Sequence, residues 1–216
     1  MYQGYGNDAV RNTAHNGMGI SAYNNNTMAS QGFPIQPDVK LKKLAFFDIL
    51  GTLLTPSTLV PINQQRMQEG TYYFHLTPQQ ASEIAMNRDI RNSAKPEYGI
   101  QVQLRFCLLE TSCEQEDYFP PNVTVKVNGK VCPLPNPIPT NKPGVEPKRP
   151  PRPVNITQHV KLSPTVANVI NVQWGTEFSR GYVISSYLVR KLNSAQLLQR
   201  MKSKGTKPAE YTRGLS

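Results

Sequence analysis

The sequence has few cysteines and no long run of apolar residues. Cys107, Cys113 and Cys132 form no Cys-x-x-Cys pair, whereas a structural zinc site needs four closely spaced ligands. The odd cysteine number, with no signal-peptide pattern at the start, predicts reduced thiols rather than disulfides. No apolar stretch reaches the length that crosses a bilayer. We therefore expect no metal, no disulfide framework and no membrane partner for this chain.

The usual patterns of catalytic sites are also missing. There is no glycine-rich phosphate loop, and the histidines His15, His75 and His159 are scattered along the chain. A nucleophilic cysteine or serine needs a base close by, and no such grouping is visible. Cys107 lies in an apolar, strand-like segment, where a thiol is commonly part of the core. We predict no catalytic residue in this chain.

Acidic residues are scarce in the second half of the chain. Residues 1–120 contain 9 Lys and Arg against 11 Asp and Glu, a net charge of −2. Residues 121–216 contain 15 against 3, a net charge of +12. Such a cationic half would attract nucleic acid or an acidic protein segment. Lysine and arginine are also the ordinary solvated residues of strands and helices, so a simple solvated surface stays open as the alternative interpretation.

The chain divides into three parts by composition. Residues 1–38 are rich in Asn and Gly and lack periodicity, which predicts a disordered linker. Residues 39–206 carry the periodic apolar pattern of a folded domain, and residues 207–216 form a short tail. One segment of the domain is acidic, and we interpret it as a solvated loop, with a metal or partner site as the alternative: Glu110, Glu114, Glu116 and Asp117.

Strand patterns dominate the domain. Alternating or β-branched runs predict strands at residues 46–54, 71–76, 100–109, 154–157, 169–174 and 182–192, and Asn128-Gly129 predicts a tight hairpin turn within residues 122–131. Trp174 is expected in the core. The sequence therefore predicts a mainly β fold that resembles a β-sandwich with about two short helices.

The two helices are predicted from their capping residues. Thr77 caps the first, with Gln80 completing a capping box, and the helix runs over residues 78–88. The second begins around Asn193-Ser194 and ends at Gly205. Helical spacing predicts which of their side chains are buried: Ala81, Ile84 and Ala85 in the first, and Leu197, Leu198 and Met201 in the second.

A proline-rich basic arm precedes the strand pattern at residue 154. Its prolines hold Lys148, Arg149 and Arg152 on an extended segment that cannot become helix or central strand. The last helix adds three further cations, Arg200, Lys202 and Lys204. If the two regions share a face, these six residues form a basic rim suited to acidic protein segments or phosphate. The alternative is an ordinary solvated loop that also serves as a nuclear-import signal.

The segment Pro153-Val154-Asn155-Ile156-Thr157 resembles the Pro-Ile-Asn-Ile-Thr signature of the PINIT domain, found in the PIAS and Siz family of SUMO ligases. The only departure is Val154, which keeps a β-branched side chain. Residues 102–107, 110–113, 115–117, 125–130, 148–150 and 187–190 are similar to the same family, and the resemblance covers roughly residues 41–214.

The resemblance implies a substrate-recognition module that binds nuclear transcription or chromatin factors and directs their sumoylation. In the family, a separate zinc-holding SP-RING grips the SUMO-charged conjugating enzyme, and a SAP domain binds DNA. Neither is expected in this chain, so zinc is expected only in the SP-RING. We expect no catalysis by this chain alone, with contact to the conjugating enzyme only in a full-length context. The alternative function is a nucleic-acid-binding or transcription-coregulator module that acts through the basic half without ligase activity.

Overall fold

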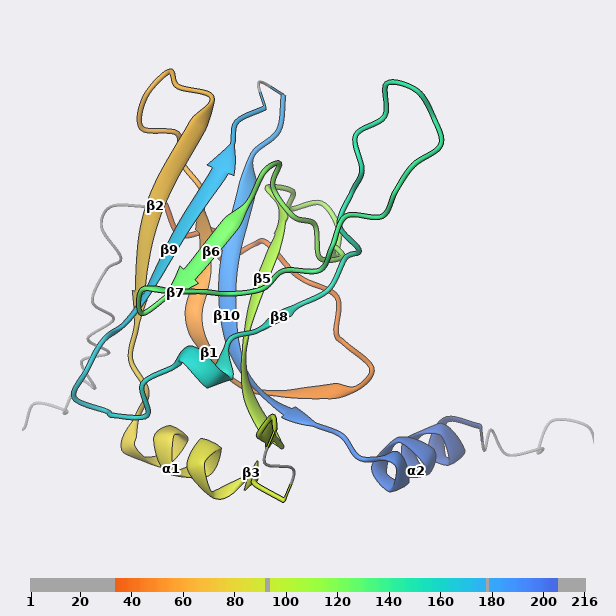
Figure 1. Cartoon of the computed structure of the whole chain (residues 1–216). Coiled ribbons are helices and arrows are strands. Elements are labelled where there is room, and N and C mark those ends of the chain that lie inside the picture. The colour runs from red at the N-terminus through yellow and green to blue at the C-terminus, as the bar shows by residue number, and fades with distance from the viewer. Residues whose placement is uncertain (1–33, 92–93, 178, 206–216) are drawn as a thin grey trace, which may run out of the picture.

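The computed structural model describes residues 34–91, 94–177 and 179–205 (Figure 1). Most of the predicted linker, residues 1–33, and the predicted tail, residues 207–216, lie outside the described residues. Residues 34–38 are described, and Ile35 forms an antiparallel bridge with Ser57. Within the described residues, no helix is both long and apolar enough to span a membrane.

In the described part of the chain, ten strands form two larger sheets and one small ribbon (Figure 1). The first sheet contains, in spatial order, β1 (Phe47–Thr58), β10 (Tyr182–Lys191), β5 (Ile100–Leu108) and β8 (Val154–Asn155). The second contains β2 (Met67–Phe74), β9 (Asn168–Gly175), β6 (Thr124–Val127) and β7 (Lys130–Val131). The ribbon pairs β3 (Arg88–Asp89) with β4 (Glu97–Tyr98). All named strand pairs are antiparallel.

The two larger sheets enclose one apolar core, which confirms the predicted mainly β, sandwich-like fold. From the first sheet, β5 contributes Val102, Leu104 and Phe106, which alternate along the strand. From the second, Ile170 and Trp174 of β9 are fully or almost fully buried. Since side chains alternate across a strand, the intervening residues of β5 point to the other side of their sheet.

Helix α1 (Pro78–Met86) closes one end of the sandwich (Figure 1). The backbone N–H of Gln80 donates to Thr77 Oγ1 at 3.1 Å, and the N–H of Thr77 donates to Gln80 Oε1 at 3.0 Å, which confirms the predicted capping box. Ala81 and Ile84 are buried as predicted. The prediction that Ala85 is buried is wrong: this residue faces solvent, because the helix presents only one narrow stripe to the core.

The hairpin between β6 and β7 has the turn that the sequence predicts. Asn128 and Gly129 have φ values of 51° and 79°, the left-handed conformation that this turn requires at both central residues. The Asn128 side chain also donates to the His159 carbonyl at 2.8 Å. The turn therefore fixes the hairpin and ties it to η1, the short helix Thr157–His159.

Candidate functional site

The signature segment, residues 153–157, contains β8 and is hydrogen-bonded to β5. Val154 and Ile156 are both buried, at 4% and 0% exposure, as predicted. The N–H of Ile156 donates to the Val102 carbonyl at 3.0 Å, and Thr157 Oγ1 accepts from the Val102 N–H at 2.9 Å. The signature thus satisfies backbone groups of β5 and fills the core beside it.

The predicted strand at residues 154–157 is too long. Only Val154 and Asn155 pair as strand, and η1 begins at Thr157. Asn155 Oδ1 accepts hydrogen bonds from the backbone N–H and the hydroxyl of Thr157. This local bond offers the backbone an alternative to the sheet ladder, so the chain turns after two residues.

The basic arm is held by contacts of its own. Lys148 forms an antiparallel bridge with Ile138, and its Nζ lies 5.6 Å from the centre of the Tyr118 ring. Arg149 Nη1 donates to the Pro135 carbonyl, and Arg152 is exposed. The arm therefore presents its cations from an anchored loop rather than from a free segment.

Helix α2 (Ser194–Gly205) carries the other three cations of the predicted basic rim. Arg200 donates to both carboxylate oxygens of Asp48 in β1, at 2.8 and 2.7 Å. Lys202 and Lys204 are exposed. In Figure 1 the arm runs toward β8 in the middle of the sandwich, whereas α2 lies at its lower right, so the two basic segments attach to different elements. Their joint action on a partner stays a prediction.

Two predicted core residues of α2 are exposed instead. Leu198 and Met201 are 52% and 70% exposed, and Leu197 is half-buried. The predicted start is confirmed, because Asn193 Oδ1 accepts from the Gln196 N–H at 2.8 Å. Helical spacing identifies an apolar stripe but does not show what covers it, and here the described residues leave most of the stripe open.

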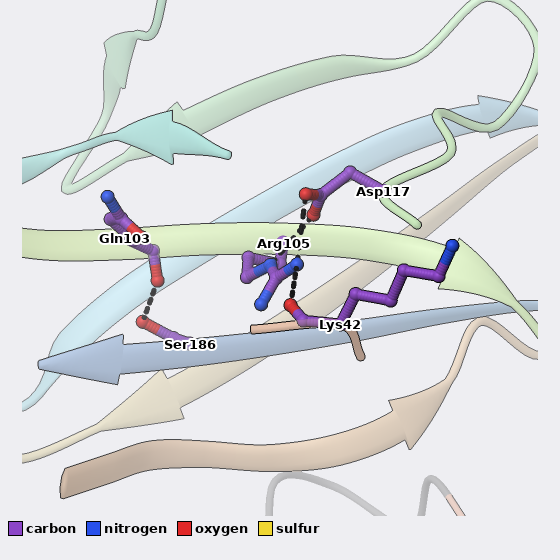
Figure 2. A network of polar contacts seen from close by, with 5 residues as sticks. All are labelled: Lys42, Gln103, Arg105, Asp117 and Ser186. Carbon is purple, nitrogen blue, oxygen red and sulfur yellow. Dashed lines mark hydrogen bonds and ion pairs between the residues drawn. The ribbon is translucent and has the colours of Figure 1, made fainter. Parts of the chain in front are cut away.

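The outer face of the first sheet contains a buried ion pair (Figure 2). Arg105 of β5 donates from Nε and Nη2 to the two carboxylate oxygens of Asp117, at 2.8 and 3.0 Å. Nη2 also donates to the Lys42 carbonyl at 3.0 Å. The side chains of the pair are only 3% and 4% exposed. The expectation that Asp117 lies in a solvated loop is therefore wrong for this residue, because its carboxylate neutralises the buried guanidinium.

A pocket of about 430 Å³ opens beside this ion pair. Its lining residues come from the outer face of β5 and β10, from the segment that leads into β1, and from the first four residues of β1. The lining residues are Lys43, Leu44, Phe47, Asp48, Ile49, Leu50, Gln103, Arg105, Tyr187 and Val189. The sequence analysis missed this site. Residues 39–42, which cover part of the face, lie about sixty residues before β5 in the chain.

The polar groups around the pocket differ in how their pKa values are shifted and in whether they have hydrogen-bond partners. The Arg200 guanidinium holds the pKa of Asp48 below its ordinary value. On the same sheet face, burial raises the pKa of the Cys107 thiol to about 12, so this thiol is not an activated nucleophile. Gln103 Oε1 and Ser185 Oγ are buried without a hydrogen-bond partner. Among the described residues, no three His, Cys, Asp or Glu side chains are grouped so as to hold a metal.

Comparison with known proteins places the chain in a family. The family model of the PINIT domain matches residues 38–190. The chain is 52% identical over 182 residues to the E3 SUMO-protein ligase PIAS3 of Homo sapiens, covering 84% of this chain and 29% of that protein. It is 50% identical over 182 residues to the E3 SUMO-protein ligase PIAS2 of Homo sapiens, with the same coverage. The chain thus spans about 29% of the length of these curated relatives.

The fold agrees with this relationship. The solved structure of the S. cerevisiae SUMO E3 ligase SIZ1 superposes with a TM-score of 0.52 at 17% identity, covering 78% of this chain and 54% of that one. At such low identity the likeness shows the shared fold alone. The signature at residues 153–157 lies inside the segment that the family model matches. From these sequence and structural comparisons together, we conclude that the chain belongs to the PINIT domain family.

Proposed function

We propose that this chain is the substrate-recognition module of a PIAS-type SUMO E3 ligase. The observation that carries the proposal is the similarity over 182 residues, at 52% identity, to a protein named as an E3 SUMO-protein ligase. In this proposal, the chain binds nuclear transcription or chromatin factors and positions them for sumoylation. It acts in the nucleus, and zinc-dependent contact with the SUMO-charged conjugating enzyme belongs to another part of the ligase.

The geometry supports a binding role. The described residues form a pocket on one sheet face. They also form two basic segments, the arm and α2, each held to the domain by an arginine hydrogen bond. Its buried thiols, Cys107 and Cys132, have pKa values raised to about 12 and about 11 by burial, which disfavours the nucleophilic thiolate. Recognition of a partner protein uses such features directly, through an apolar centre and a polar rim.

A single-turnover discharge assay tests whether the chain leaves activation of the SUMO thioester to another part of the ligase. SUMO-charged conjugating enzyme is mixed with free lysine, with and without the isolated chain, and loss of the thioester is followed over time. We expect the same discharge rate in both reactions, because the chain would bind substrate and not activate the thioester. Clear acceleration by the chain alone would show that it contributes to transfer itself and would contradict the recognition role.

A second candidate function is nucleic-acid binding, and the net charge of +12 over residues 121–216 is the observation that favours it. Several cations of this half already have partners, since Arg200 pairs with Asp48 and Arg149 binds the Pro135 carbonyl. Fluorescence anisotropy with a labelled DNA duplex separates the two functions. A site with six or more phosphate contacts would lose about 10³-fold in affinity between 50 and 200 mM salt. Strong, steeply salt-dependent binding would favour the second function over the first.

A further inference from the structure

The pocket beside Arg105 combines apolar walls with an unsatisfied polar floor. Leu44, Ile49, Leu50 and Val189 supply aliphatic surface, and Phe47 adds an aromatic ring. A pocket of about 430 Å³ lies within the range of specific small-ligand sites. This composition is typical of a site in which a few polar groups orient a mainly apolar ligand.

The floor contains a polar side chain that the fold leaves incomplete. Gln103 lines the pocket, is 2% exposed, and its Oε1 has no hydrogen-bond partner. A buried polar atom without a partner destabilises a folded protein, so native proteins keep few of them. The last torsion of a glutamine side chain is soft, and its rotation turns either the oxygen or the NH₂ group toward the pocket. Gln103 can therefore both accept from and donate to a ligand.

Two of the three charged side chains that line the pocket have partners within the chain, and the third, Lys43, is exposed to solvent. Asp117 neutralises Arg105 through two hydrogen bonds, and Arg200 neutralises Asp48 at the rim. A charged ligand would have to lose its hydration without gaining a free counter-charge on the floor, which is unfavourable. A neutral hydroxyl, by contrast, can donate and accept at once and matches the two capacities of the Gln103 amide.

We propose that this pocket receives a tyrosine side chain of a partner protein, with its ring against the apolar walls and its hydroxyl bonded to Gln103. Tyrosine is among the residues that most often anchor protein interfaces. The inference rests on the proposed function, because the partner is a protein that the module recognises. Two of the lining residues, Ile49 and Leu50, are exposed apolar side chains and extend the contact surface beyond one side chain.

Matched small probes test the pocket directly on the full chain. N-acetyl-tyrosinamide and N-acetyl-phenylalaninamide differ by one hydroxyl, and binding of each is followed through the methyl NMR signals of Leu44, Leu50 and Val189. We expect the tyrosine probe to bind about tenfold more tightly, the ratio that one hydrogen bond provides. In Gln103→Leu the ratio should fall to about one. Gln101→Leu serves as control, because Gln101 lies two residues earlier on β5 and does not line the pocket.

The outcomes separate this inference from the proposed function. Equal binding of the two probes, or methyl shifts only elsewhere in the domain, would overturn the tyrosine assignment. Should neither probe bind while Gln103→Leu raises the melting temperature, the pocket holds only solvent and the proposal is wrong. The exposed variant Leu50→Asp, which needs no change in the core, should also abolish the shifts of the Leu44 and Val189 methyl signals. If the wild-type chain captures SUMO acceptor proteins and Leu50→Asp captures them equally well, the recognition function stands and the pocket is not its site.

Discussion

The buried ion pair between Arg105 and Asp117 predicts a large loss of stability when one partner is removed. Asp117→Ala leaves the guanidinium in place, 3% exposed, without its carboxylate. Two charge-assisted hydrogen bonds are lost, each contributing about 1.5–3 kcal/mol. Breaking a buried pair from one side typically costs about 3–5 kcal/mol, which agrees with that range. We therefore expect Asp117→Ala to lower the free energy of unfolding by about 3–5 kcal/mol.

Urea and thermal unfolding measure this effect. For a domain of this size, each 1 kcal/mol lowers the melting temperature by about 2–4 °C, so a drop of about 6–20 °C is expected. The neighbouring residue supplies the control. Glu116 bonds to Lys42 at 3.2 Å, but those side chains are 68% and 52% exposed, and an exposed pair contributes only about 0–1 kcal/mol. Glu116→Ala should therefore melt almost like the wild type.

A double variant shows whether the stability is lost because a buried charge is left unpaired or because the ion pair itself is missing. Arg105→Met with Asp117→Leu removes both charges and keeps similar volume, and such replacements of buried pairs are often neutral or stabilising. We expect it to recover most of the stability lost in Asp117→Ala. If Asp117→Ala costs less than 1 kcal/mol, like Glu116→Ala, the ion pair does not hold the outer face together and the reasoning is refuted.

Three further predictions follow from burial and charge. Ile156→Ala removes a fully buried side chain from the core, so urea unfolding should show a loss of about 2–4 kcal/mol, and an unchanged midpoint would contradict a structural role for the signature. Burial raises the pKa values of Cys107 and Cys132 to about 12 and about 11, above the ordinary 9.0, so the stability these thiols contribute is constant below pH 9 and falls as pH rises through 11–12. A pH series of urea midpoints checks this, and a rise in stability above pH 9 would show that the sign is wrong. Lys148→Glu with Arg149→Glu should slow association with an acidic partner at low salt and less so at high salt, as stopped-flow mixing would show, while losing about 1 kcal/mol of stability through the Arg149 bond to Pro135. Association rates equal to those of the wild type at low salt would remove the arm from the interface.

The elements that depend on local chemistry are predictable from the sequence. The capping box of Thr77 and Gln80 and the turn at Asn128-Gly129 are decided by residues within three positions of each other. The alternation along β5 predicts which residues enter the core. Local rules also explain the error at residues 154–157, since the Asn155 side chain bonds two residues ahead and ends the strand.

The candidate pocket could not be predicted in the same way. The residues Gln103 and Arg105 occupy polar positions of an alternating strand, which would ordinarily face solvent. Part of that face is covered by a segment far away in the sequence: Val39 and Leu41 pack against Cys107 of β5, and the Lys42 carbonyl accepts from Arg105. The reverse holds for α2, where an apolar stripe at Leu198 and Met201 has the spacing of a core helix but stays exposed. In both cases the deciding contact is between distant parts of the chain.

Capture of partner proteins tests the central claim, that the chain recognises SUMO substrates, most directly. The full chain is immobilised and incubated with nuclease-treated nuclear extract, and retained proteins are identified by mass spectrometry beside those retained by Asp117→Ala at a temperature where that variant is unfolded. The proposed function predicts that proteins known to carry SUMO are enriched severalfold on the folded chain and remain bound at 200 mM salt. Retention of the same proteins on folded and unfolded chains, or no enrichment of SUMO acceptors, would contradict it.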